Sequence, residues 1–114
     1  MRQLPIAAFL ALLAAAPFAV PPSTADAQEA GNKARGLDLA LRVCANCHAV
    51  AVGETVSPVS AAPSFEDVAD TPGMTGMALS AFLSTPHRTM PNLILTPEEI
   101  GDVTAHILSL KDGG

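Results

Sequence analysis

Five consecutive residues, Cys44-Ala45-Asn46-Cys47-His48, constrain the fold of this chain more than any other feature of its sequence. The run has the C-x-x-C-H pattern by which haem c is attached to proteins. One turn of helix would carry both sulfurs to the same edge of the porphyrin, where they form thioethers with its vinyl groups. His48 then follows beneath the ring, in position to coordinate the iron. The motif therefore predicts Cys44 and Cys47 as covalent attachment residues and His48 as an iron ligand.

Two cysteines in one short run also fit a disulfide or a zinc site. Thiol oxidoreductases carry a Cys-x-x-Cys at the start of a helix that follows a strand. Here a helical pattern precedes the motif, and nothing upstream has the pattern of a strand. A zinc site would need a fourth ligand at a customary spacing from Cys44, Cys47 and His48, and none lies nearby. Haem is therefore the favoured interpretation of the motif.

Residues 1–27 have the organisation of a secretory signal peptide. Arg2 supplies a minimal positive charge, 4–20 are mostly apolar, and Ala25-Asp26-Ala27 has the small-x-small form of a cleavage site. The apolar stretch contains two prolines and is shorter than the roughly 20 residues that span a bilayer, so an uncleaved membrane anchor is the weaker alternative. We expect cleavage after Ala27, export to the periplasm and no stable membrane anchor in the mature protein.

Residues 28–114 are expected to form one small domain. Their number is only slightly above the roughly 80 residues below which a hydrophobic core alone supplies little stability. The chain has no Trp and no Tyr, and Phe65 and Phe82 are the only phenylalanines beyond the signal peptide. A covalent haem would supply the apolar centre that this composition lacks.

Helical patterns, and the lack of any segment that alternates as a strand, predict an all-α fold. The first helix is expected to run from Lys33 into the haem motif, with shorter helices at 64–69 and 75–84. Residues 49–62 and 85–95 have no helical period and are expected to be loops. The domain is thus expected to consist of short helices packed around the haem.

The last helix has the clearest start signal in the chain. Thr96 is the expected N-cap, Pro97 occupies the first helical position, and Glu99 completes a capping box. Apolar residues then recur at spacings of 3, 4 and 3, so that they share one face of the helix. These residues are Ile100, Val103, Ile107 and Leu110.

Gly36 lies inside the first predicted helix, on one stripe with Ala40, Val43 and Cys44. Glycine inside a helix is unfavourable by about 1 kcal/mol relative to alanine. We therefore expect another part of the backbone to approach closely at Gly36.

The residue opposite His48 decides whether the iron transfers electrons or binds exchangeable ligands. Met90 is the predicted second iron ligand. It lies in the loop between two predicted helices, after Pro86 and directly before Pro91. Prolines make the backbone of this loop rigid, so it can present the Met90 thioether across the haem from His48.

Other side chains of suitable chemistry have alternative interpretations. Met74 and Met77 lie before or in a helix that is expected to face the haem, where methionine is usually core filling. His106, next to Ile107 in the last helix, is expected to be exposed or interhelical. His87 shares the loop of the predicted ligand, so bis-histidine ligation stays open, as does a site with no second protein ligand.

Three motifs together resemble the small class I c-type cytochromes of bacteria: Cys44–His48, Met90-Pro91-Asn92, and the run 95–100 that opens the last helix. The resemblance covers roughly Gly31 to Lys111. It implies an all-α cytochrome c fold, in which three to five short helices wrap around one covalently bound haem.

The resemblance also implies two specific contacts. In the family, the first and last helices cross through a close glycine contact, which gives Gly36 its use, and the position opposite it, commonly aromatic, corresponds to His106. A proline after the haem motif, here Pro63, offers its carbonyl to the ligand imidazole. Such a hydrogen bond would select the tautomer of His48 and raise its basicity.

The resemblance implies a one-electron carrier rather than an enzyme. Two permanent ligands leave no position for a substrate, and thioether ligation favours the reduced state of the iron. Phe65, Phe82, Leu93 and Leu95 are expected to line the haem pocket. Two alternatives stay open: a gas-binding or sensor protein with an open or exchangeable second position, and a dedicated electron-transfer subunit of a periplasmic dehydrogenase.

The expected partners are redox proteins, namely an electron donor and an electron acceptor such as a periplasmic dehydrogenase or a terminal oxidase or reductase. The formal net charge of the chain is −5. Nucleic-acid binding depends on Lys and Arg that neutralise phosphates, so this acidic balance argues against it. Partners with basic or largely apolar contact surfaces are favoured.

Overall fold

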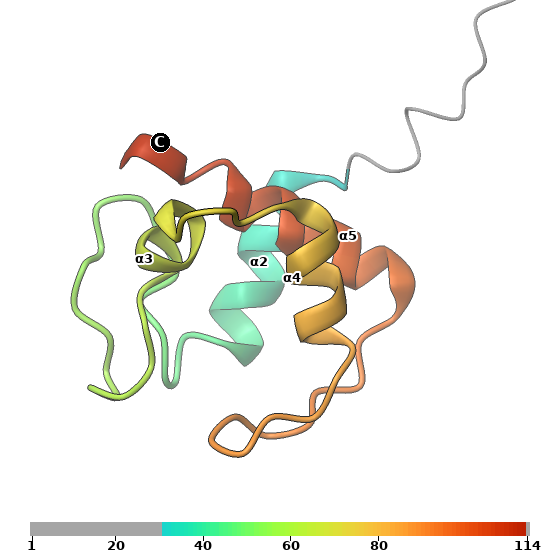
Figure 1. Ribbon diagram of the computed structural model, residues 1–114. Helices are drawn as coiled ribbons and strands as arrows, with labels where there is room; N and C mark the ends of the chain where they lie inside the picture. The colour runs from blue at the N-terminus through green and yellow to red at the C-terminus, as the bar shows by residue number, and fades with distance from the viewer. Residues whose placement is uncertain (1–30, 114) are drawn as a thin grey trace, which may run out of the picture.

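The computed structural model describes residues 31–113, which form an all-helical fold (Figure 1). The elements are α2 (Lys33–Val43), α3 (Phe65–Asp70), α4 (Gly76–Leu83), α5 (Pro97–Leu108) and the 3-10 turn η1 (Lys111–Gly113). No strand occurs within 31–113, and the predicted all-α class is confirmed. Across the same residues, no helix has the length and apolar character needed to cross a membrane. The predicted signal peptide, 1–27, lies outside the described residues.

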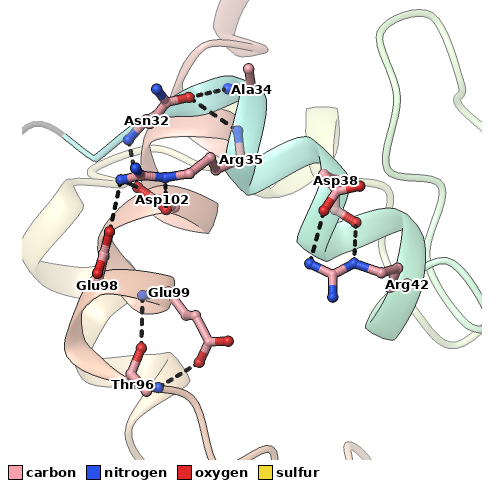
Figure 2. Close-up of polar contacts among 9 residues, drawn as sticks. All are labelled: Asn32, Ala34, Arg35, Asp38, Arg42, Thr96, Glu98, Glu99 and Asp102. Carbon is pink, nitrogen blue, oxygen red and sulfur yellow. Dashed lines mark hydrogen bonds and ion pairs between the residues drawn. The ribbon is translucent and has the colours of Figure 1, made fainter.

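Each α-helix begins after a residue whose side chain accepts a hydrogen bond from the first turn, which satisfies a backbone N–H that the helix itself leaves free. Asn32 caps α2, Ser64 caps α3 and Thr75 caps α4. At α5, the Thr96 hydroxyl accepts from the Glu99 N–H, and the Glu99 carboxylate accepts from the Thr96 N–H (Figure 2). The predicted capping box and the predicted helix positions are confirmed.

Helix α5 crosses α2 near the N-terminal turn of α2 (Figure 1). A β-carbon on Gly36 would collide with the carbonyl oxygen of Asp102 and would lie 2.9 Å from the β-carbon of His106. Gly31 meets the backbone of Gly101 in the same way. The close approach predicted at Gly36, with His106 on the opposite helix, is therefore confirmed.

A buried carboxylate joins the same two helices. Asp102 on α5 accepts hydrogen bonds from Arg35 Nε at 2.8 Å, from Arg35 Nη2 at 3.2 Å and from the Asn32 backbone N–H at 2.6 Å (Figure 2). The hydrogen bond from Arg35 holds the pKa of Asp102 below its ordinary value. Helix α2 has no acidic residue in its first turn, so Asp102 supplies the negative charge that a helix N-terminus favours.

The hydrophobic core lies where α5 packs against α2, α3 and α4. Its buried members are Leu39, Ala40, Val50, Phe65, Ala69, Leu79, Val103, Ile107 and Leu110. Val43 shares a stripe of α2 with Gly36 and Ala40 in the sequence, but Val43 is 40% exposed in the structure, whereas Ala40 is fully buried.

Candidate haem site

The haem motif forms a tight turn at the end of α2. Cys44 is the C-cap of this helix, and its carbonyl accepts hydrogen bonds from the N–H groups of Cys47 at 3.0 Å and His48 at 2.9 Å. Both cysteines are free and half-buried. Burial raises the pKa of the Cys44 thiol to about 11. The reactive cysteine of a thiol oxidoreductase has a lowered pKa, so the raised pKa of Cys44 does not favour that interpretation. Among the described residues, no group of three His, Cys, Asp or Glu side chains is placed to hold a metal ion, so zinc is not favoured either.

The imidazole of His48 is held by the chain on its C-terminal side. Its Nδ1 lies 2.7 Å from the carbonyl oxygen of Pro63, the contact that the family resemblance implied. A carbonyl oxygen only accepts hydrogen bonds, so Nδ1 carries the proton and Nε2 keeps a free lone pair. The ring of Phe65 packs against the imidazole, with ring centroids 5.6 Å apart. His48 is therefore in the tautomer that coordinates a metal through Nε2.

The loop that follows His48 satisfies its own backbone groups. The N–H of Ala49 donates to the Ser57 hydroxyl at 3.0 Å, and the N–H of Val50 donates to the Glu54 carboxylate at 3.2 Å. The carbonyl of Ala49 accepts from the Phe65 N–H at 2.9 Å, which joins the loop to α3. These bonds give a loop without regular structure a defined conformation around the imidazole.

Met90 is half-buried in the loop between α4 and α5. It lines a cavity together with Phe82, Leu93 and Leu95, three of the four side chains predicted for the haem pocket. The fourth, Phe65, packs against His48 instead. His48 lines another cavity, together with Ala45 and Val50.

His87, the main rival to Met90, is engaged elsewhere. Its ring stacks on that of Phe82, with centroids 3.5 Å apart and planes at 19°. Its Nε2 also lies 2.5 Å from the carbonyl oxygen of Phe82. Both contacts join His87 to the end of α4.

The other candidate ligands divide into two groups. Met74 packs against the core as predicted, whereas the prediction that Met77 fills the core is wrong, because Met77 is 85% exposed. Helix α4 buries the side that carries Leu79 and leaves Met77 outside. His106 is buried and its β-carbon faces Gly36 of α2, so it is interhelical and not exposed, and its Nε2 bonds to the carbonyl oxygen of Val50 at 2.7 Å.

Apolar side chains near the motif are exposed to a degree that suits a bound apolar group. Val43, directly before Cys44, is uncovered at the end of α2. The N–H of Val59 donates to the carbonyl of Cys47 at 3.2 Å, and the Val59 side chain is exposed as well. Phe82, beside the Met90 loop, is 51% exposed. The exposed Val43 and Val59 beside the free thiols, and the exposed Phe82 beside Met90, fit a covalent haem.

The sequence did not predict the contact of Asp102 with Arg35 or that of His106 with Val50. The available signal was the position of the two α5 residues: both are polar residues beside the apolar positions Val103 and Ile107 of the last helix. A polar residue next to a buried stripe needs a partner, but the pattern does not name that partner.

The chain belongs to the monohaem c-type cytochromes. Cytochrome c-552 of Bradyrhizobium diazoefficiens is 44% identical to it over 89 residues, which are 78% of this chain and 82% of that relative. No family model matches the chain, and no solved structure matches it. This relative confirms the family resemblance that the sequence motifs indicated.

Proposed function

We propose that the protein is an exported one-electron carrier with a single haem c. Cys44 and Cys47 hold the group through thioether bonds, and His48 and Met90 coordinate its iron. The observation that carries this proposal is the imidazole of His48, whose Nδ1 is bound to the Pro63 carbonyl while Nε2 stays free beside two free thiols. The name of the relative, cytochrome c-552, supports the same class of function.

When bound, the haem supplies an iron that gains or loses one electron. The chain's own residues confine the site to that reaction. His48 and Met90 would hold the iron and leave no position for a substrate, and Leu93 and Leu95, which line the cavity of Met90, would keep water away from it. The Pro63 carbonyl raises the basicity of the His48 imidazole. The proposed protein is therefore a carrier and not an enzyme.

The proposed mature protein is residues 28–114, located in the periplasm after removal of 1–27. The support is the charged start, apolar stretch and small-x-small site of that segment. Amino-terminal sequencing of the protein from a periplasmic fraction tests the proposal. The expected first residue is Gln28, and a start at Met1 would contradict cleavage.

The proposed partners are redox proteins that dock with few charge contacts. Arg88 is the single Lys, Arg, Asp or Glu within 71–97, and Glu54 is the single one within 43–65. These two segments contain every predicted haem contact, so the charged residues lie mainly elsewhere in the chain. A partner with an apolar contact surface fits segments of this composition. Co-purification from the native periplasm would show whether the protein is a free carrier or a dehydrogenase subunit.

Absorption spectra of oxidised and reduced holoprotein test the ligand set. We expect sharp low-spin bands and the weak charge-transfer band at the red end of the spectrum that a bond from Met90 sulfur to ferric iron gives. Absence of that band would show that Met90 is not an iron ligand. Ready binding of carbon monoxide by the reduced wild type would instead favour a gas-binding or sensor protein.

A further inference from the structure

His106 is a buried titratable side chain that the proposed electron carrier does not use. Its β-carbon lies over Gly36 at the α2–α5 crossing, and its ring reaches the segment that follows the haem motif. Nε2 lies 2.7 Å from the carbonyl oxygen of Val50. Because a carbonyl only accepts, Nε2 carries a proton and donates it to this bond.

Val50 is the second residue after His48 and is fully buried. Its N–H donates to Glu54 and its carbonyl accepts from His106, so both polar groups of this peptide segment are occupied. A buried carbonyl that lost its donor would pay a desolvation penalty, and the backbone would shift to find another. The hydrogen bond from His106 thus holds the chain on the C-terminal side of the imidazole.

Phe65 forms a second connection between the two histidines. Its ring centroid lies 5.6 Å from that of His48 and 6.1 Å from that of His106, with tilted planes in both pairs. Phe65 follows Pro63, whose carbonyl accepts from Nδ1 of His48, by two residues. His106 is therefore linked to His48 in two ways: by its bond to Val50, two residues after His48, and through Phe65, whose ring lies between the two imidazoles at 5.6 and 6.1 Å from them.

We infer that His106 is a positioning residue for His48: through its hydrogen bond to Val50 and its contact with Phe65, it sets the plane of the imidazole. This inference rests on the proposed role of His48 as iron ligand. Groups that orient a ligand tune the metal it binds, so the orientation of His48 influences the electronic state of the iron. A residue that only filled space at this position would need no donor aimed at Val50.

The test compares holoprotein carrying H106F, H106Q or T104V with wild type. H106F keeps an aromatic ring but removes the donor to Val50, and H106Q keeps an N–H donor. T104V is the matched control, because Thr104 is also buried on α5 but lies beside Gly76 of α4. Its hydroxyl has no hydrogen-bond partner in the described structure, so valine removes no hydrogen bond.

Two properties are measured: the spread of the haem-methyl proton NMR shifts in the ferric state, which follows the planes of the axial ligands, and the reduction potential. We expect H106F to change both, while T104V keeps the wild-type values and H106Q stays close to them. Wild-type values in H106F would overturn the inference. Equal changes in H106F and T104V would also overturn it, because they would reflect general loosening of α5.

If H106F does not accumulate as folded holoprotein, H106L, which also removes the donor to Val50, takes its place. A changed methyl spread in H106L with a wild-type spread in H106Q supports the positioning role, and a wild-type spread in H106L contradicts it. The proposed function is judged separately, from the wild-type spectrum. A wild type without low-spin His/Met ligation contradicts the ligand set, whereas a low-spin wild type with an unchanged H106F contradicts only the role of His106.

Discussion

The carbonyl oxygen of Asp102 lies where a β-carbon at Gly36 would be, so α2 and α5 reach their observed separation only because residue 36 is glycine. The same residue, Asp102, binds Arg35 and the start of α2 through its carboxylate. One position on α5 therefore determines both the distance between the helices and their polar connection.

G36A is expected to destabilise the holoprotein. Alanine favours the helix by about 1 kcal/mol over glycine, but its methyl group would collide with the backbone of α5. Overpacking of this kind costs about 1–3 kcal/mol, and we expect a net loss of stability in urea unfolding. G101A is the control, since a β-carbon there would lie 3.9 Å from the nearest atom outside its own helix, Gly31 Cα. If G101A were as destabilising as G36A, the collision would not be the cause.

Loss of the Asp102 carboxylate is expected to remove stability that depends on pH. The hydrogen bond from Arg35 lowers the pKa of Asp102 in the folded state, so the unfolded chain takes up a proton first as pH falls. This contribution is complete above the ordinary aspartate pKa of about 4 and is lost below it. D102N should therefore be less stable than wild type at neutral pH, and the two should converge as the solution is acidified.

Thermal unfolding of D102N across this acid range measures the effect. D38N is a matched control, because Asp38 pairs with Arg42 on the exposed face of α2 (Figure 2). An exposed pair of this kind contributes at most about 0.5 kcal/mol. A constant difference between D102N and wild type at every pH would contradict the proposed origin of the effect.

M90A is expected to open the second axial position of the iron. The red charge-transfer band should disappear from the oxidised spectrum, and the reduced protein should bind carbon monoxide, because alanine has no donor atom. H87A is the comparison that separates the two residues of this loop, since His87 stacks on Phe82 and bonds to its carbonyl. H87A should keep the band. A wild type that lacks the band, and whose reduced form binds carbon monoxide in H87A but not in M90A, would assign the ligand to His87.

T96A is expected to lower the free energy of unfolding by about 1 kcal/mol. Alanine removes the hydroxyl that accepts from the Glu99 N–H at the start of α5. T96S keeps an oxygen at this position and should restore most of the loss, as measured by urea unfolding with unchanged haem spectra. Equal stability of T96A and T96S would show that the cap contributes little.

A structural feature was predictable from the sequence where it depends on residues within one helical turn. The start of α5 was predictable because Thr96, Pro97 and Glu99 act on one another within a single turn. The exposure of Met77 was not predictable, because it depends on which side of α4 faces α5. Its helix is apolar on several sides, and such a helix does not reveal from its own pattern which side is buried.

The sequence by itself determined the haem motif and the capped start of α5, since both depend on residues close together in the chain. Only the tertiary structure decided that Arg35 binds Asp102, 67 residues away, and that His106 reaches Val50, 56 residues away. Such pairs form when two helices pack at one crossing point, and a donor in one segment then meets an acceptor in another. Local pattern shows that a buried polar group needs a partner, and the packing of the helices selects which one it has.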